Sequence, residues 1–172
     1  MDIEAYEDNH LSARNYPLDV DKYIQEELKI GSLVGPFTEP PFEFFHCSPL
    51  MSREKNDTTK RRIITDVRYP DELSVNSFIP TNTIMGKMRE HKLPRSDDVV
   101  KYINMQNDDY WLSSLDMANA YKHWFCCPSD YPLFTIKWKG QYYIEVTIPF
   151  GARNSSLIQQ TISNAILDIL NH

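Results

Sequence analysis

The sequence predicts an α+β fold for this chain of 172 residues. Apolar residues recur at helical spacing near both ends of the chain, and alternating residues in between form strand pairs joined by short turns. The order of these elements lacks the strand–helix–strand repeat of a parallel sheet. Hydrophobic residues make up 41% of the chain, which is enough for one compact domain with a core.

In the first half, residues 1–15 are polar and acidic and are predicted to lack stable structure. A helix is predicted over 18–30, closed by Gly31 in a left-handed conformation. Its apolar stripe consists of Val20, Tyr23, Ile24 and Leu28. The following GPFTEPPF is predicted to be a connection, because its prolines exclude a helix or a central strand.

Two hairpins are predicted. FEFFHCSPLMSRE and RRIITDVRY form strands around the turn KNDTTK, and LFTIKWKGQYYIEVTI folds back at Lys139 and Gly140. Between the hairpins, YPDELSVNSFIP is irregular, Ser96 caps a helix over 97–105, and YWLSSLDM is a strand. A last helix covers Ser155–Leu170. Its expected buried face consists of Leu157, Ile158, Ile162, Ala165, Ile166, Ile169 and Leu170.

The formal net charge of −6 is unusual for a nucleic-acid-binding protein, but the charges are unevenly distributed. Acidic residues crowd the first 45 positions. Basic residues gather around the first hairpin, at Arg53, Lys55, Lys60, Arg61, Arg62 and Arg68. This strip could bind a phosphate, or it could simply be a solvated hairpin tip.

The three cysteines include no CxxC pair, which argues against a disulfide scaffold or a zinc site. Reduced thiols and the absence of an apolar N-terminal run favour an intracellular protein, cytoplasmic or nuclear. No apolar stretch approaches the roughly 20 residues of a membrane-spanning helix, so no membrane partner is expected.

Three segments could carry chemistry. Asp116 ends an apolar strand and needs a partner there, either a hard cation such as Mg²⁺ or the backbone that it would cap. IPFGARNSS places a glycine and Arg153 before a helix start, as an anion site or as a plain turn and cap. Lys55 and Arg62 flank a tight turn and could converge on a triphosphate.

Taken in order, these segments resemble the reverse transcriptases of retroelements. The resemblance is strongest to the DIRS-like and Ngaro-like retrotransposons, with similarity to the gypsy-like and retroviral enzymes, and it runs from about Leu18 to the C-terminus. It rests on GSLVGPFTEPPFEFFHCSPLMSREKN, on KNDTTKRRIITDVRYPDELSVN with its R-x-I-x-D-x-R and S-V-N patterns, on YWLSSLDMANAYKHW, and on FTIKWKGQYYIEVTIPFGARNSSLIQQ.

The resemblance implies the fingers and part of the palm of a right-hand polymerase. After the 1–15 tail, the expected parts are fingers at 16–95 and 119–150, the palm strand with the catalytic Asp at 96–118, and the palm helix at 151–172. The chain reaches His172 without a Y-x-D-D motif, so it is expected to be truncated before the other catalytic carboxylates.

By the same resemblance, Asp116 is the catalytic aspartate and, with the carbonyl of Met117, a ligand of the two Mg²⁺ ions of a complete enzyme. The implied nucleotide-binding residues are Lys55, Arg62, Ala120, Tyr121, Phe150 and Gly151. The implied template-binding residues are Asp66, Arg68, Arg153 and Gln160, with Asp66 and Arg68 expected to form a salt bridge. Ser156 and Gln159 depart from the family, which has proline and phenylalanine there.

The implied function is a fragment of an RNA-directed DNA polymerase, inactive as an isolated chain. Its expected partners are an RNA or DNA template with primer, deoxynucleoside triphosphates and the remainder of the polymerase chain. One alternative is a catalytically dead remnant that binds nucleic acid or acts as a scaffold. Another is an unrelated metal-dependent nucleotidyl enzyme on a similar fold. A truncated palm is expected to leave the last helix exposed and to self-associate.

Overall fold

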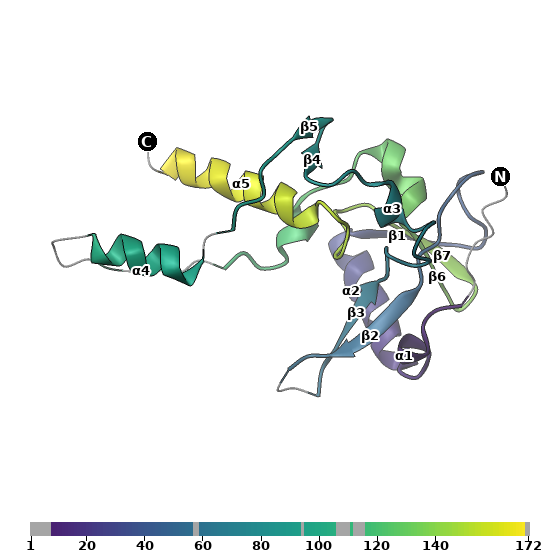
Figure 1. The fold of residues 1–172 in the computed structure, drawn as a ribbon. Coiled ribbons are helices and arrows are strands. Elements are labelled where there is room, and N and C mark those ends of the chain that lie inside the picture. The colour runs from purple at the N-terminus through teal and green to yellow at the C-terminus, as the bar shows by residue number, and fades with distance from the viewer. Residues whose placement is uncertain (1–7, 57–58, 94, 106–110, 112–115, 171–172) are drawn as a thin grey trace.

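The computed structural model describes residues 8–56, 59–93, 95–105, 111 and 116–170 (Figure 1). Within these residues, helices and strands are mixed, and the strands form small antiparallel sheets. The largest sheet has the order β1-β7-β6, and β2 and β3 form a separate hairpin. The mixed α and β content agrees with the predicted fold class.

Helix α2, Pro17–Ile30, confirms the first predicted helix. It ends at Gly31, whose φ of 77° is the left-handed conformation that a residue without a Cβ adopts most easily. Val20 and Ile24 are buried on one face of α2, as the spacing predicts. They share a core cluster with residues of both hairpins and of β1, among them Leu33, Leu50, Ile63, Ile136, Trp138 and Tyr143.

The segment around Gly35 and Pro36 contains a strand where a connection is predicted. Strand β1, Leu33–Phe37, pairs with β7 at the edge of the sheet, with an irregularity between Val34 and Phe37. Pro36 is compatible with an edge position because only one side of such a strand needs N–H donors. At Gly35, a Cβ would lie 2.9 Å from the carbonyl oxygen of Tyr142, so glycine lets the two backbones approach.

The prediction for residues 1–15 is wrong in its second half. Helix α1, Leu11–Arg14, packs against the first hairpin, and Ala13 is fully buried. Asn9 attaches this segment to strand β2, because its Oδ1 accepts a hydrogen bond of 2.7 Å from the backbone N–H of Leu50. The buried Ala13 and the side-chain amide of Asn9 therefore hold in place a segment whose polar composition predicts disorder.

Both predicted hairpins are confirmed. Strands β2, Leu50–Glu54, and β3, Arg61–Thr65, pair in antiparallel register, and the extended segment before them contributes a bridge between Cys47 and Thr135. Strands β6, Thr135–Trp138, and β7, Gln141–Glu145, turn at two residues with φ of 50° and 78°. These are Lys139 and Gly140, and two positive φ angles match the twist of a tight hairpin.

The middle of the chain contains short elements. These are α3 (Val75–Phe78), β4 (Thr83–Ile84), β5 (Lys87–Met88), α4 (Ser96–Asn104), and the 3₁₀ helices η1 (Ala120–His123) and η2 (Pro128–Phe134). Helix α4 begins one residue earlier than predicted. Its cap is Arg95, whose backbone N–H donates to Asp98. Most of the strand predicted at YWLSSLDM lies outside the described residues. Of its described members, Trp111 is exposed, and Asp116 and Met117 lie in irregular backbone.

Helix α5, Ser155–Leu170, has the predicted bounds, but its predicted buried face holds only for the first turns. Leu157 is 2% exposed, whereas Ile166 and Ile169 are 38% and 75% exposed. Ala165 is also exposed, contrary to prediction. The reason is geometric: α5 runs away from the sheets, so its second half leaves the core (Figure 1).

The three cysteines are free thiols, as expected. Burial raises the pKa of Cys47 to about 11 and that of Cys126 to about 12, so both thiols stay protonated at neutral pH. Among the helices of the described residues, none has the length and apolar content needed to cross a membrane.

The exposed half of α5 predicts self-association. Replacing Leu167 and Ile169 together by Lys should reduce it in sedimentation velocity, because charge opposes burial of this face. The double variant should keep the wild-type melting temperature. Leu157→Ala, on the buried half, should instead lose about 2–4 kcal/mol of unfolding free energy. A wild-type chain that stays monomeric at every concentration would contradict the prediction.

Candidate functional site

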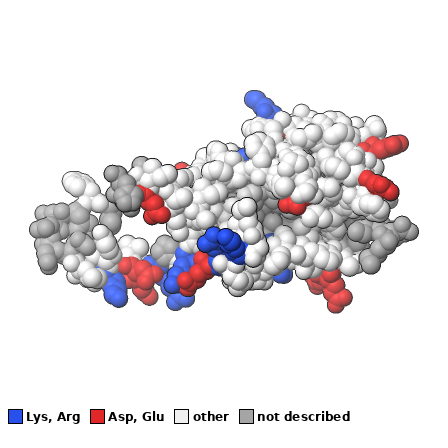
Figure 2. Space-filling model, turned by 90° about the horizontal axis from the view of Figure 1, so that it is seen from above, with Lys and Arg blue, Asp and Glu red and all other residues white. Residues whose placement is uncertain are grey.

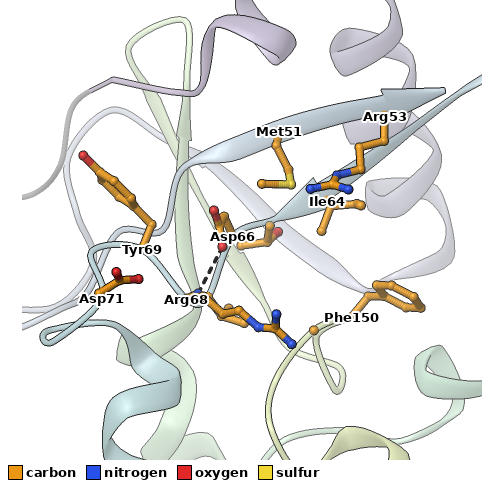
Figure 3. Close-up of a pocket in the computed structure, with 11 residues that line it drawn as sticks. Met51, Arg53, Ile64, Asp66, Arg68, Tyr69, Asp71 and Phe150 are labelled. Atoms are coloured by element: carbon orange, nitrogen blue, oxygen red, sulfur yellow. Dashed lines mark hydrogen bonds between the residues drawn. The ribbon is translucent and has the colours of Figure 1, made fainter.

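A pocket of about 420 Å³ lies between the β2–β3 hairpin, the turn that follows β3 and the loop before α5. Figure 3 shows Arg53 and Ile64 above it on the hairpin, Arg68 below and Phe150 at one side. The complete lining is Met51, Arg53, Ile64, Thr65, Asp66, Val67, Arg68, Tyr69, Asp71, Phe150 and Gly151. Four residues predicted for nucleotide or template binding therefore line one pocket: Asp66, Arg68, Phe150 and Gly151.

The two faces of the hairpin differ in charge. On the inner face, Arg61 is neutralised: its Nε donates to Ser52 Oγ at 2.6 Å, and its guanidinium lies 2.8 Å from Glu54. On the outer face, Arg53 and Arg62 lie directly opposite each other. Within the described residues, no ion pair neutralises either of these two guanidinium groups. Like charges that lie opposite each other on paired strands repel, so binding of an anion between the two arginines would relieve this repulsion.

The ring of Phe150 connects two predicted nucleotide-binding residues. The guanidinium of Arg62 lies 5.5 Å from its centroid, and the ring of Tyr121 lies 5.7 Å away at an interplanar angle of 57°. These contacts bring together β3, η1 and the loop before α5. Phe150 is half exposed, so an aromatic face remains accessible between the cation and the tyrosine.

Asn76 fixes this loop and was missed as a functional residue. Its Nδ2 donates to the carbonyl of Gly151 at 2.9 Å, and the backbone N–H of Arg153 donates to its Oδ1 at 2.7 Å. The side chain is buried, and its own backbone N–H donates to Val67. Asn76 thus connects the end of β3 to the loop. The S-V-N pattern contains it, but sequence alone does not reveal which backbone it binds.

The predicted salt bridge between Asp66 and Arg68 is wrong. Asp66 pairs with His10, whose Nε2 lies 2.9 Å from its carboxylate, while Arg68 donates only its backbone N–H, at 3.2 Å. The short turn after β3 directs the two side chains apart, which leaves the Arg68 guanidinium at the pocket (Figure 3). His10 belongs to the segment predicted to be unstructured, so it was not considered.

Other predicted residues lie around the pocket rather than in it. The guanidinium of Arg153 donates to the carbonyl of Ile79 at 3.0 Å, which is a structural contact. Gln160 lies on α5 with a buried Oε1. Lys55 follows β2, and its backbone N–H donates to the carbonyl of Lys60, which extends the hairpin ladder toward the turn. Ala120 begins η1 beside Tyr121.

Asp116 is exposed at the start of the segment that leads to η1. Among the described residues, no three His, Cys, Asp or Glu side chains gather where a metal ion could bind. Met117 contacts Gln159, whose amide Nε2 lies 3.5 Å from its sulfur. Gln159 also accepts a 2.9 Å hydrogen bond from the indole of Trp124. The glutamine that replaces the phenylalanine of the family pattern therefore attaches residues 117–124 to α5.

Charges of both signs are mixed on the part of the surface that Figure 2 shows. On the face seen in Figure 2, Lys and Arg side chains lie among Asp and Glu side chains over otherwise uncharged surface. The opposed arginines on the outer face of the hairpin are a local concentration of positive charge in a chain of net charge −6.

No protein-family model and no curated protein sequence matches the chain. Solved structures do match it. A CSH mutant of the prototype foamy virus protease–reverse transcriptase aligns with a TM-score of 0.62 and 19% identity, over 96% of this chain and 19% of that one. Two foamy viral protease–reverse transcriptase structures in complex with double-stranded DNA have TM-scores of 0.58 and 0.57, with 15% and 17% identity. They match 94% and 96% of this chain, which spans 23% and 29% of their length.

The chain has the fold of a region of retroviral reverse transcriptases. The match covers nearly all of this chain and less than a third of each of these neighbours. At such low identity the likeness concerns the fold and leaves the retrotransposon subclass open.

The Asn76 contacts lead to a stability prediction. Asn76→Ala removes two hydrogen bonds and leaves a carbonyl and an N–H without partners, so it should cost about 2 kcal/mol of unfolding free energy in urea titrations. Asn164→Ala, at an exposed position of α5, is the matched control and should change that value by less than about 0.5 kcal/mol. Equal effects of the two substitutions would contradict the role assigned to Asn76.

Proposed function

We propose that this chain is the fingers and part of the palm of an RNA-directed DNA polymerase, and that it binds a primer–template and a deoxynucleoside triphosphate at the hairpin and its pocket. The observation that carries the proposal is the pair of opposed arginines, Arg53 and Arg62, on the outer face of the hairpin beside a pocket lined by Arg68 and Phe150. The match to reverse transcriptase folds supports it, and two of those neighbours hold double-stranded DNA.

The chemistry of the pocket fits a strand of nucleic acid with its phosphates and bases. A guanidinium group can donate two parallel hydrogen bonds to the oxygens of one phosphate. The exposed face of Phe150 offers a surface on which a base can stack. The apolar Met51 and Ile64, paired across the hairpin, line the pocket and offer an apolar surface for a base or sugar. Tyr121 closes the far side of Phe150, where the nucleotide sugar is proposed to lie.

Asp116 is proposed as the first metal-binding aspartate, with the carbonyl of Met117 beside it. Two Mg²⁺ ions would supply the activation of the primer hydroxyl and the neutralisation of the leaving pyrophosphate in a complete enzyme. One carboxylate cannot hold two divalent ions, and the described residues contain no group of three or more His, Cys, Asp or Glu side chains that could complete the site. The proposed role of the described residues is therefore to bind and orient the substrates.

Binding should depend on the outer face of the hairpin. Arg53→Ala and Arg62→Ala should each weaken binding of a primer–template with a single-stranded template overhang about tenfold, or ~1.4 kcal/mol, in fluorescence anisotropy. Each should also lower the slope of log affinity against log salt by about one. Lys22→Ala, at an exposed cation of α2, is the control and should leave both quantities unchanged. Equal losses in all three variants would reject the site.

Primer extension separates the polymerase proposal from its alternative. The 172-residue chain contains no Y-x-D-D motif and should bind primer–template without extending the primer in Mg²⁺. Steady nucleotide incorporation would show that no further carboxylate motif is needed. If the reading frame that encodes the chain supplies such a motif, the longer protein should extend the primer, and Asp116→Asn should abolish extension. A longer protein that binds but never extends would favour the catalytically dead remnant.

A further inference from the structure

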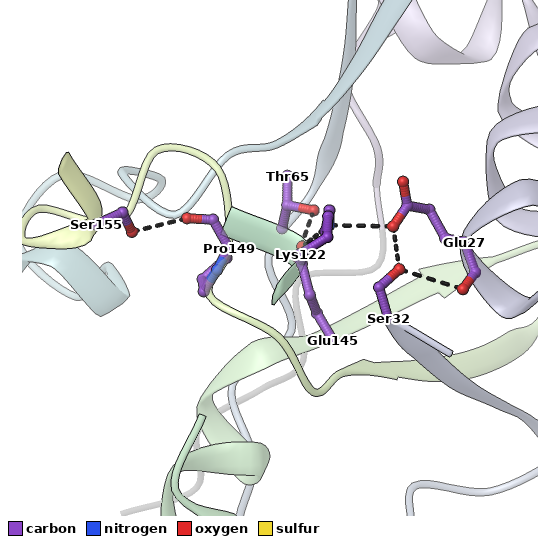
Figure 4. Close-up of polar contacts among 7 residues, drawn as sticks. All are labelled: Glu27, Ser32, Thr65, Lys122, Glu145, Pro149 and Ser155. Carbon is purple, nitrogen blue, oxygen red and sulfur yellow. Dashed lines mark hydrogen bonds and ion pairs between the residues drawn. The ribbon is translucent and has the colours of Figure 1, made fainter. Parts of the chain in front are cut away.

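A buried cluster of charges adjoins the proposed site at Thr65, which ends β3 and also lines the pocket (Figure 4). The ammonium of Lys122 lies 2.6 Å from Glu145 Oε1 and 3.1 Å from Glu27 Oε2. The three side chains are 17%, 3% and 13% exposed, respectively. Thr65 Oγ1 donates to the second oxygen of Glu145 at 3.4 Å, and the hydroxyl of Ser32 contacts Glu27.

The cluster joins elements that are far apart in the sequence. Glu27 belongs to α2, Glu145 ends β7, Thr65 ends β3, and Lys122 belongs to η1. Three of these elements are already attached to one another through the core and the sheet. Helix η1 is a four-residue 3₁₀ turn with no buried residue, and the side chain of Lys122, 17% exposed, attaches it to that core.

The electrostatics favour the charged form of Lys122. Burial lowers the pKa of Lys122, but the carboxylates of Glu145 and Glu27 outweigh that effect, so its pKa lies above the ordinary value. Burial raises the pKa of Glu145, and Lys122 offsets part of that rise. Replacing a buried ion pair by apolar residues is often neutral or stabilising. Stability alone therefore does not explain why charged groups occupy this place.

Geometry offers an explanation. Tyr121 precedes Lys122 in η1, and its ring packs on Phe150 at the edge of the site. We infer that Lys122 is a positioning residue, whose two ion pairs fix η1 against the core and so hold the ring of Tyr121 on Phe150, where it selects the sugar of the bound nucleotide. The selection of the sugar rests on the proposed nucleotide binding. The positioning of Tyr121 does not.

An ion pair suits this task better than an apolar contact. One ammonium lies between two carboxylates on different elements, so a shift of Lys122 would leave at least one buried carboxylate without its partner. The backbone N–H of Lys122 donates to the carbonyl of Asn119 at 2.8 Å, so a shift of this side chain moves the turn that contains Tyr121.

Hydrogen–deuterium exchange tests the positioning directly. Lys122→Met should speed amide exchange about tenfold in peptides that cover 117–125, while exchange in the β2–β3 hairpin stays at the wild-type rate. Lys139→Met is the matched control, because Lys139 also lies 2.6 Å from a carboxylate, that of Asp21, but at the exposed hairpin turn. The control should leave 117–125 unchanged.

A second variant covers the case in which Lys122→Met fails to fold because two carboxylates lose their partner. Lys122→Met combined with Glu145→Met removes the most buried unpaired charge and should fold. In this variant, 117–125 should still exchange about tenfold faster. Wild-type exchange there, or uniformly faster exchange throughout the chain, would overturn the inference, because it would leave Lys122 with a role in stability alone.

Nucleotide titrations separate this inference from the proposed function. The wild-type chain should bind dGTP more tightly than GTP, and the Lys122 variants should reduce that ratio severalfold, whereas Arg62→Ala should weaken both nucleotides alike. An unchanged ratio in Lys122 variants that bind dGTP would overturn the role in sugar selection. If the wild-type chain binds neither nucleotide, both the proposed nucleotide binding and the sugar selection fail. The exchange measurements still decide the positioning of Tyr121.

Discussion

The backbone pairing of strand β7 is the constraint on which the rest of the structure depends. β7 lies between β1 and β6, and the chain keeps pairing after the strand ends, with Ser32 on one side and the segment 124–126 on the other. This continuous buried ribbon leads directly into Phe150 and the loop before α5. It also holds η1, because the chain that pairs with it at Trp124 has just left that turn. These hydrogen bonds fix the chain that follows η1 and the chain that leads to Phe150, and the ion pairs of Lys122 act on the turn between them.

Local chemistry made much of the fold predictable. Alternating residues and turn residues such as Lys139 and Gly140 specify the two hairpins, and helical spacing specifies α2 and α5 with few errors in their bounds. The errors occur where a long-range contact overrides composition. Ala13 is buried although its segment is polar, and β1 forms at a proline because β7 supplies its partner. The second half of α5 is largely apolar but finds no core at its position.

The candidate site was predictable in its residues and less so in its connections. The R-x-I-x-D-x-R pattern has a period of two, so Arg62 and Ile64 share the outer face of the hairpin, as a strand requires. Arg53 lies beside them because the register of β2 and β3 places it opposite Arg62, and a single sequence does not reveal that register. Asn76 and Lys122 are ordinary polar residues in sequence. Their importance comes from the backbone and carboxylates that they reach, between 23 and 95 positions away.

The bulged, proline-containing strand β1 has a consequence for how copies of this chain can meet. An open sheet edge invites a strand from another molecule, which is the first step toward fibrous aggregates. At β1 the outer edge is broken by an irregularity between Val34 and Phe37, and Pro36 has no N–H to offer. Addition of a foreign strand would therefore stop within a few residues. The β1 edge of the sheet is therefore a poor starting point for a growing cross-β stack.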